Sequence, residues 1–468
     1  MLRSSPNPFA SKTPGTIDLE ISDPVLMLNE VAKRYETTER VLMEYVDNAL
    51  DDAEALYREN GNTYPYPIQI DITIDRASRA ITVLDNCRGM TRETLERVVR
   101  NVGESQKRGL SWVNGRFGFG VHAFRAAAES VSFQTKHAVS SHHILTVQRE
   151  QHRGIKEAKR LDDPFPTDNG TGCCVTVAGF DRDWFQSVTT DSIKAEIENH
   201  FERLIARPNL LITVGEAGET RQPCQPFPYE QIEGSTLQQT LEVVYKEAVY
   251  PVTLVCQIAN QPLNRPVSFF ARGRRIGQVT EIKSFMRKSV HKTSVWSHPH
   301  LVGYIEVGEI VQPIINRDDF VRTYGRTLLY EALLPVETQL KALLAAVNEE
   351  RRESTFVQFE QTVQQVLKAA TSGTSKFMVT FGEEADGKRR VWWENGRLTI
   401  NTSHPDFQAR LRTSRLGNPR PSDRMSAYLA GVLSVYGTAE LADVEERAAR
   451  QIDLMFTLEA ELREMQKK

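Results

Sequence analysis

The sequence has few cysteines, no long apolar run and no strong excess of charge of one sign. Its five cysteines among 468 residues follow neither a metal-ligand spacing nor a secreted disulfide framework, which favours a reducing cytoplasm. No stretch approaches the roughly 18 apolar residues of a membrane span, and residues 1–8 lack the apolar centre of a signal peptide. A net charge of −3 argues against a uniformly basic nucleic-acid-binding protein and leaves room for a local basic patch.

The remaining composition is that of an ordinary globular protein, with 40% hydrophobic and 25% charged residues. The chain is too long for one core, so its length predicts two to four domains. Residues 1–18, rich in Pro, Ser and Thr, are expected to form a flexible arm. We expect three domains to follow, at 19–185, 190–350 and 355–468.

The first domain is expected to place helices on one face of an antiparallel or mixed sheet, which makes the predicted class α+β. Apolar residues recur at helical spacing over 24–60, and apolar and polar residues alternate strictly over 68–74. Residues 80–84 are the expected hairpin partner of that strand, and a helix is expected to begin at Thr91. The further predicted strands of this domain are 130–135, 143–149 and 173–178.

The second and third domains are also predicted to mix helices and strands. For the second, the pattern predicts a helix over 193–205, strands over 211–214, 240–248, 252–258, 267–271 and 303–307, and a helix over 325–347. For the third, it predicts a helix over 355–370, strands over 376–381 and 391–400, and two C-terminal helices, the last over 439–468. Asn395-Gly396 is typical of a hairpin turn, and His404 is expected to pack or cap.

One candidate motif is carried by the first helical pattern. Glu44 and Asn48 are four residues apart and Asp51 follows three later, so all three share a helix face. An amide oxygen suits Mg²⁺, and a carboxylate one turn away can deprotonate a water molecule. Taken alone, the spacing is uninformative, because such a pattern is more often a solvated helix face.

A second motif lies at the end of the next apolar run. Asp85 follows Ile81–Leu84, and a carboxylate at such a strand end can accept a hydrogen bond from an exocyclic amine in an apolar pocket. Gly89 permits the turn that follows. The alternative is a strand-end Asp that caps the next helix.

The third motif is a glycine-rich loop. Gly115, Gly118 and Gly120 allow backbone N–H groups to point at phosphate oxygens, and a helix expected to start near Val121 would add its positive end. The loop lacks the Gly-Lys-Ser/Thr of a Walker A sequence and does not follow a strand as a dinucleotide fingerprint does. A structural turn remains the alternative.

The order of these motifs, with Gly170-Thr171 before a later strand, resembles the GHKL ATPase superfamily over residues 25–180. That superfamily includes the ninety-kilodalton heat-shock chaperone, MutL, type II topoisomerases, histidine kinases and MORC proteins. The resemblance implies a Bergerat-type ATPase sandwich that binds ATP and Mg²⁺ and hydrolyses ATP to ADP and phosphate. It also implies a mobile lid spanning 101–120.

The resemblance also implies roles for individual residues. Glu44 would be the general base, Asn48 the Mg²⁺ ligand, and Asp85 the acceptor of the adenine amine, supported through water by Thr171. Asp51 would face the adenine side. The residues expected to line the adenine pocket are Gly89 and Met90, and those expected to wrap the phosphates are Gly115, Arg116, Phe117, Gly118, Phe119, Gly120 and Val121. The family usually has Gly where Cys87 stands, and a Cβ there would narrow or tilt the pocket.

Further segments look like the MORC and MutL branch. Ser105-Gln-Lys107 is similar to the lid of those proteins, in which the Lys approaches the phosphates. Phe269–Ile276, Gly303–Glu306 and Pro313–Phe320 resemble a transducer domain, with Arg317 where the MORC family has a γ-phosphate-sensing Lys. The second domain would then be a ribosomal-protein-like α/β transducer, followed by a small α+β domain of unknown role.

The resemblance implies an ATP-gated clamp that dimerises on ATP binding and acts on DNA or a protein client. By analogy with relatives of this layout, the clamp would serve DNA processing or defence. Contacts to DNA phosphates are expected from Lys107, Arg108, Arg272, Arg274 and Arg275. One alternative is a nucleotide-gated scaffold with little turnover, and another is a chaperone-like ATPase. A histidine kinase is not favoured, since no phosphoacceptor helix pair precedes the motifs.

Overall fold

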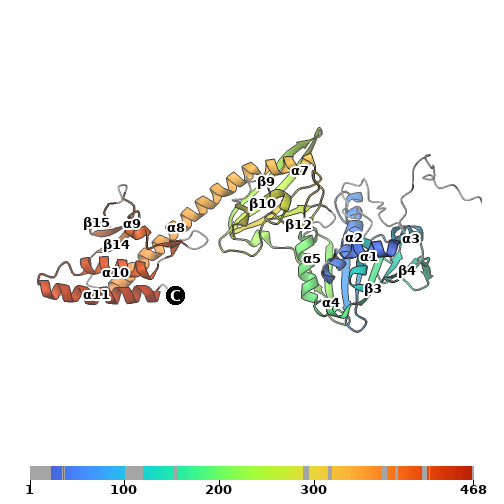
Figure 1. Cartoon of the computed structure of the whole chain (residues 1–468), viewed down its shortest axis with the longest axis horizontal. Coiled ribbons are helices and arrows are strands. Elements are labelled where there is room, and N and C mark those ends of the chain that lie inside the picture. Colours follow the sequence, from blue (N-terminus) through green and yellow to red (C-terminus); the bar gives the residue numbers. More distant parts are fainter. Residues whose placement is uncertain are drawn as a thin grey trace, which may run out of the picture.

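The structure is a computed structural model. It describes residues 23–33, 35, 37–100, 120–151, 156–287, 295–314, 319–370, 377–384, 388–413, 419–420 and 422–465. Figure 1 shows three bodies that follow one another along the long axis in sequence order. None of the helices in these ranges combines the length and apolar character needed to cross a membrane.

The first body is built on a mixed sheet, which confirms the predicted α+β class. Within the described residues the strand order is β5-β4-β3-β6-β2-β1-β7-β8. Strand β1 pairs in parallel with β7 and antiparallel with β2. The strands are β1 (Ile68–Asp75), β2 (Ala80–Asp85), β3 (Ala128–Lys136), β4 (His142–Gln148), β5 (Lys159–Leu161), β6 (Gly172–Phe180), β7 (Leu210–Glu216) and β8 (Gln222–Pro223).

Helices cover the apolar face of this sheet. The isoleucines of β1 are buried with Val46 and Leu50 of a long helix, while Gln69 and Thr73 lie on the opposite face with a polar network around Asp71. The helical elements are α1 (Pro24–Ala32), α2 (Thr38–Glu59), α3 (Arg92–Arg100), the short 3-10 helix η1 (Gly120–Ala126), α4 (Arg182–Gln186) and α5 (Thr190–Ile205).

The helical pattern over 24–60 is divided into α1 and α2. Thr37 adopts an extended backbone conformation, and its side chain accepts a hydrogen bond from the Arg40 N–H, which caps α2. An extended N-cap cannot continue a preceding helix, so the chain breaks there.

The first body extends beyond the boundary expected at 185. Strand β7 adds to the edge of the sheet by pairing with β1, and Ile197 and Phe201 of α5 belong to the same core. Cys224, after β8, is the last residue of that core cluster. The sequence did not reveal this, because the pairing of β7 with β1 joins segments more than 100 residues apart.

The second body contains another sheet, with order β12-β11-β13-β10-β9 among the described residues. Its two longest strands form a hairpin whose turn, Lys246 and Glu247, has positive φ at both residues, as a two-residue type I′ turn requires. The elements are η2 (Tyr229–Gln231), β9 (Gly234–Tyr245), β10 (Ala248–Ala259), β11 (Ser268–Ala271), β12 (Arg274–Gln278), α6 (Lys283–Met286), η4 (Val295–Ser297), β13 (Leu301–Glu306) and α7 (Tyr324–Ala332).

A single helix, α8 (Leu334–Ala370), joins the second body to the third. Its first part contributes Leu340 to the second core, and its last part contributes Leu367 to the third. The sequence predicted a helix over 325–347 and a separate one over 355–370. Pro335 separates α7 from α8, because proline lacks the N–H and clashes with the preceding turn, whereas residues 348–356 contain no Gly or Pro and continue the helix.

The third body packs helices against a small sheet with order β14-β16-β15. Asn395 and Gly396 both have positive φ in the turn between β15 and β16, as expected. His404 caps α9 by accepting a hydrogen bond from the Asp406 N–H, in agreement with its predicted role. The elements are β14 (Met378–Gly382), β15 (Val391–Glu394), β16 (Arg397–Asn401), α9 (Pro405–Gln408), β17 (Arg412–Thr413), β18 (Pro419–Arg420), α10 (Asp423–Gly437) and α11 (Val444–Met465).

Candidate functional site

Helix α2 presents two adjoining rows of polar side chains. Glu44, Asn48 and Asp52 recur at every fourth residue and form one row, and Asp47 and Asp51 form the next. Glu44, Asn48 and Asp52 are half-buried, whereas Asp47 and Asp51 are buried. One helix therefore offers a base, an amide and several carboxylates within three turns.

Asp85 is a buried carboxylate at the end of β2, with 5% of its surface exposed. Its Oδ1 accepts hydrogen bonds from the N–H of Cys87 at 3.0 Å and from the N–H of Cys173 at 3.2 Å. The second donor is in place because Asp85 is the register partner of Cys173 in the antiparallel pairing of β2 with β6. The sheet itself thus fixes the orientation of this carboxylate.

The surroundings of Asp85 place its titration near neutral pH. Burial, and next the charge of Asp52, raise the pKa of Asp85 to about 7, although the N–H groups of Cys87 and Cys173 oppose the shift. A carboxyl group with a pKa near 7 changes its charge close to physiological pH, and pKa values shifted in this way are typical of functional sites.

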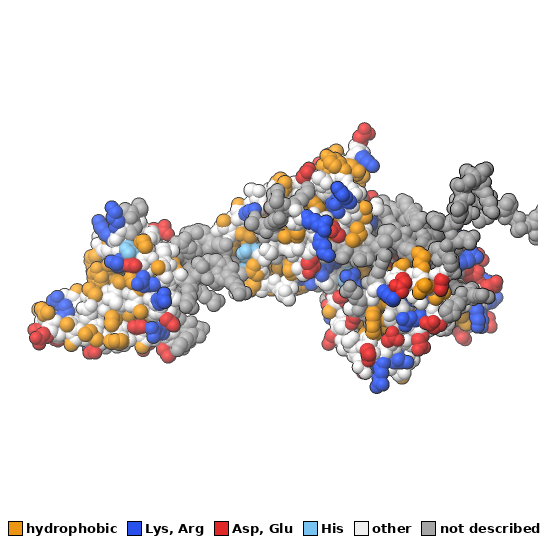
Figure 2. All heavy atoms as spheres, viewed as in Figure 1, with side chains coloured by type: hydrophobic (Ala, Val, Ile, Leu, Met, Phe, Trp, Pro, Cys, Tyr) orange, Lys and Arg blue, Asp and Glu red, His pale blue; other side chains and the backbone are white. Residues whose placement is uncertain are grey.

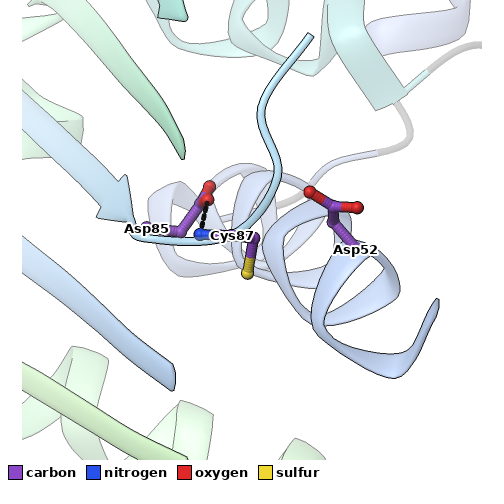
Figure 3. A group of neighbouring side chains, drawn as sticks. All are labelled: Asp52, Asp85 and Cys87. Atoms are coloured by element: carbon purple, nitrogen blue, oxygen red, sulfur yellow. Dashed lines mark hydrogen bonds between the residues drawn. The ribbon is translucent and has the colours of Figure 1, made fainter. Parts of the chain in front are cut away.

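Asp52, Asp85 and Cys87 have potential ligand atoms within 4.8 Å of one another. Figure 3 shows the two carboxylates pointing to the same side and the Cys87 sulfur pointing the other way. The thiol donates to the Ala49 carbonyl at 3.8 Å, and burial raises its pKa well above the usual range. A neutral thiol is a poor metal ligand, and Mg²⁺ prefers oxygen ligands. These three residues therefore fit the hydrogen-bonding lining of a ligand pocket better than a metal centre.

Asp52, which the sequence analysis did not single out, is the α2 carboxylate beside Asp85. Its carboxylate also accepts hydrogen bonds from the Arg88 side chain at 2.7 Å and from the Arg88 N–H at 3.0 Å, which ties α2 to the turn after β2. Asp51, expected on the adenine side, instead pairs with Arg274 at 2.8 Å. The signal for Asp52 was its place four residues after Asn48 in the Glu44 row.

The turn after β2 requires Gly89. Its φ is +69°, and a Cβ there would lie 2.3 Å from the Lys136 carbonyl oxygen. The N–H of the next residue, Met90, donates to the Thr135 hydroxyl at 2.7 Å, and the Thr171 hydroxyl donates to the Cys87 carbonyl at 2.9 Å. The structure therefore brings Gly89, Met90 and Thr171 to the Asp85 end of the sheet.

Gly120 and Val121 approach the other end of the Glu44 row. A Cβ on Gly120 would lie 2.6 Å from Glu44 Oε2, so any larger residue there would require the Glu44 carboxylate to shift. The Tyr45 hydroxyl donates to the Val121 carbonyl at 3.2 Å and accepts from the Phe124 N–H at 3.1 Å. The expected α-helix near Val121 is instead the 3-10 helix η1, because strand β3 begins at Ala128 and leaves room for about two turns.

The structure leaves part of the expected site outside its described residues. These are Ser105, Lys107, Arg108, Gly115, Arg116, Phe117, Gly118 and Phe119 of the expected lid, and Arg317 of the second body.

The expected DNA contacts of the Arg272–Arg275 turn need correction. Arg274 is 2% exposed and paired with Asp47 and Asp51, so it cannot reach a DNA phosphate. Arg275 is half-buried and donates to the Ser268 hydroxyl. On the face shown in Figure 2, Lys and Arg side chains are interspersed with Asp and Glu over the first body.

Comparison with known proteins matches residues 35–166 to the family of histidine kinase-, DNA gyrase B- and HSP90-like ATPases. The matched range runs from before α2 to beyond β5 and includes Glu44, Asn48 and Asp85. It covers less than a third of the chain and supports the GHKL resemblance, with ATP binding and hydrolysis, for the first body. No protein of curated function is significantly similar to the chain.

Proposed function

We propose that the chain binds ATP with Mg²⁺ and hydrolyses ATP to ADP and phosphate. The observation that carries this proposal is the buried Asp85 carboxylate in the matched region. It is fixed by the N–H groups of Cys87 and Cys173 and adjoins the helix row that also holds Glu44 and Asn48. An ionised carboxylate in such a setting suits the exocyclic amine of adenine, because an unsatisfied buried acceptor is unfavourable. Gly89, Met90 and Thr171 would complete the adenine end.

The other end of the α2 row would handle the phosphates. Glu44 would accept the proton of the attacking water at its carboxylate, and the amide oxygen of Asn48 suits a hard cation. Mg²⁺, when bound, supplies positive charge that offsets the charge developing on the phosphate oxygens. The close approach of Gly120 to Glu44 supports placing the phosphates there.

The proposed phosphate contacts extend to residues outside the described ranges. Ser105, Lys107 and the 115–119 segment would enclose the phosphates, with Gly120 and Val121 as the end of that segment. Lys107 and Arg317 would place their positively charged side chains beside the γ-phosphate.

At the level of the whole protein we propose an ATP-gated dimerising clamp of the MORC-like or MutL-like branch, with the second body as its transducer. The sheet of the second body, with helices α7 and α8 against it, is compatible with that role. ATP would drive closure only by binding the closed dimer more tightly than the open form. The client would be DNA or a protein.

The test is a comparison of hydrolysis and binding. Glu44→Ala should lower the phosphate-release rate by about 10²- to 10⁴-fold, the range ascribed to a positioned general base, while the affinity for an ATP analogue changes only a few-fold. Glu39→Gln, on the same helix but outside the Glu44 row, is the matched control and should keep the wild-type rate.

Two outcomes would contradict the enzyme proposal. A wild type that binds ATP but releases phosphate no faster than Glu44→Ala would favour the nucleotide-gated scaffold. A wild type that binds no ATP would remove both proposals.

A further inference from the structure

Arg274 of β12 reaches out of the second body to helix α2 of the first. Its guanidinium donates to the Asp47 carboxylate, to the Asp47 carbonyl at 3.4 Å and to Asp51 Oδ1 at 2.8 Å. The exposed fractions of Arg274, Asp47 and Asp51 are 2%, 2% and 0%. A charged group this deeply buried is held in one place by its partners, because moving it away would leave uncompensated charge in the interior.

The two carboxylates lie beside the proposed catalytic row. Asp47 directly precedes Asn48, and Asp51 lies one turn further along α2, in the row next to Glu44, Asn48 and Asp52. A shift of Arg274 would therefore act on the same two turns of helix that carry the proposed base and metal ligand.

The hairpin turn before Arg274 is seated firmly on the first body. Arg272 and Gly273 both have positive φ, and a Cβ on Gly273 would lie 2.7 Å from Leu204 of α5. The Gly273 N–H donates to Glu306 Oε2 of β13 at 3.0 Å. The turn is thus held between α5 and the sheet of the second body, and this placement directs Arg274 at α2.

We propose that Arg274 is a positioning residue that couples the second body to the nucleotide site: by holding Asp47 and Asp51, it sets the placement of Glu44 and Asn48. This inference rests on the proposed ATPase function. Adenine recognition is assigned to Asp85 on β2, whose Oδ1 is fixed by the N–H groups of Cys87 and Cys173. The coupling through Arg274 would therefore act on the phosphate end of the site and leave the adenine end in place.

The first test separates catalysis from binding in the full chain. Arg274→Met should lower kcat for ATP hydrolysis at least tenfold and raise the Mg²⁺ concentration for half-maximal rate several-fold, while the affinity for ADP stays within about threefold. Arg274→Lys should give an intermediate kcat, because an ammonium cannot bridge two carboxylates as the planar guanidinium does.

The matched control is Arg265→Met. Arg265 pairs with the buried Glu202 of α5 and lies over the Phe227 ring, so it joins the same two bodies without touching α2. Arg265→Met should keep kcat within about twofold of the wild-type value, even if its thermal midpoint falls. A tenfold loss of kcat in Arg265→Met as well would overturn a specific role for Arg274.

A neutralised triad keeps the proposal testable if Arg274→Met folds poorly. Asp47→Asn/Asp51→Asn/Arg274→Met removes the buried charges together, so it should recover the thermal midpoint that Arg274→Met loses, yet its kcat should stay at least tenfold below wild type. A wild-type kcat in this variant or in Arg274→Met would overturn the inference and leave the ATPase proposal standing. A wild type without ATP hydrolysis would overturn the ATPase proposal, and the inference with it.

Discussion

At the scale of single residues, the surroundings of Asp85 bring its change of charge close to neutral pH. Its pKa is raised from 3.8 to about 7, with burial as the largest cause. The proposed adenine contact needs the ionised form, because only that form is purely a hydrogen-bond acceptor. Nucleotide affinity should therefore vary with pH as the ionised fraction of Asp85 does.

The affinity for ADP should rise with pH. Below the pKa of about 7 the folded protein holds Asp85 protonated, and above it the carboxylate is free to accept the amine. Between pH 6 and pH 8 the ionised fraction grows about tenfold, so the dissociation constant should fall by about that factor. Calorimetric titration at constant ionic strength would measure it.

Asp85→Asn supplies the control for this pH dependence. An amide cannot reproduce the carboxylate, so ATP and ADP binding should be lost or severely weakened at every pH. Undiminished binding of an ATP analogue by Asp85→Asn would contradict the adenine assignment.

Part of the residue-level site could be predicted from the sequence. Asp85, Gly89 and Thr171 gather at one end of the sheet. The turn from Asp85 to Gly89 could be predicted because turn chemistry is a local property, whereas the place of Thr171 was implied only by the family resemblance. Asp51 and Asp52 could not be told apart. Neighbouring residues of a helix point about 100° apart, and only the position of Arg274, more than 200 residues later, shows which carboxylate faces the second body.

At the scale of elements, the contact between α2 and η1 holds the proposed base next to Gly120. The buried Tyr45 hydroxyl satisfies both the Val121 carbonyl and the Phe124 N–H. Buried backbone groups that lose such a partner are unfavourable. Tyr45 is therefore the side chain that fastens η1 to α2.

Tyr45→Phe should lower the free energy of unfolding by about 1–3 kcal/mol, the range for buried polar groups left unsatisfied. It should also slow ATP hydrolysis, since Gly120 would no longer be held against Glu44. Denaturant unfolding and a phosphate-release assay measure the two effects. Tyr57→Phe, half-buried on the same helix, is the control and should change both less. An unfolding free energy equal to wild type in Tyr45→Phe would contradict this role.

Local periodicity predicted most elements of the first body but not where that body ends. The alternating isoleucines of β1 could be read directly, since every second side chain meets the helices. β5, only Lys159–Leu161, was missed because three residues show no periodicity. The expected end of the first body at residue 185 was too early, because β7 joins the first sheet by pairing with a strand far away in the sequence. The sequence analysis divided α8 into two helices, because the polar residues in the middle of α8 form no apolar face.

At the scale of the whole molecule, the clamp proposal predicts a change of oligomeric state. A non-hydrolysable ATP analogue should shift the protein from monomer to dimer in sedimentation velocity, because the analogue would bind the closed form more tightly. ADP is the control and should leave the sedimentation coefficient unchanged.

Arg317→Ala should spare ATP-analogue binding within a few-fold and reduce the dimer fraction. A wild-type sedimentation coefficient that is the same with and without the analogue would contradict the clamp proposal. A dimer fraction in Arg317→Ala equal to that of the wild type would remove Arg317 from the proposed γ-phosphate contact.

Helix α8 gives the molecule a mechanical property of its own. Its 37 residues span about 55 Å at 1.5 Å per residue, and its two ends are embedded in different cores. A helix anchored in this way acts as a lever arm: a tilt of about 10° at the second body displaces the far end by about 10 Å. A tilt of that size in the second body would thus move the third body by about the width of a helix.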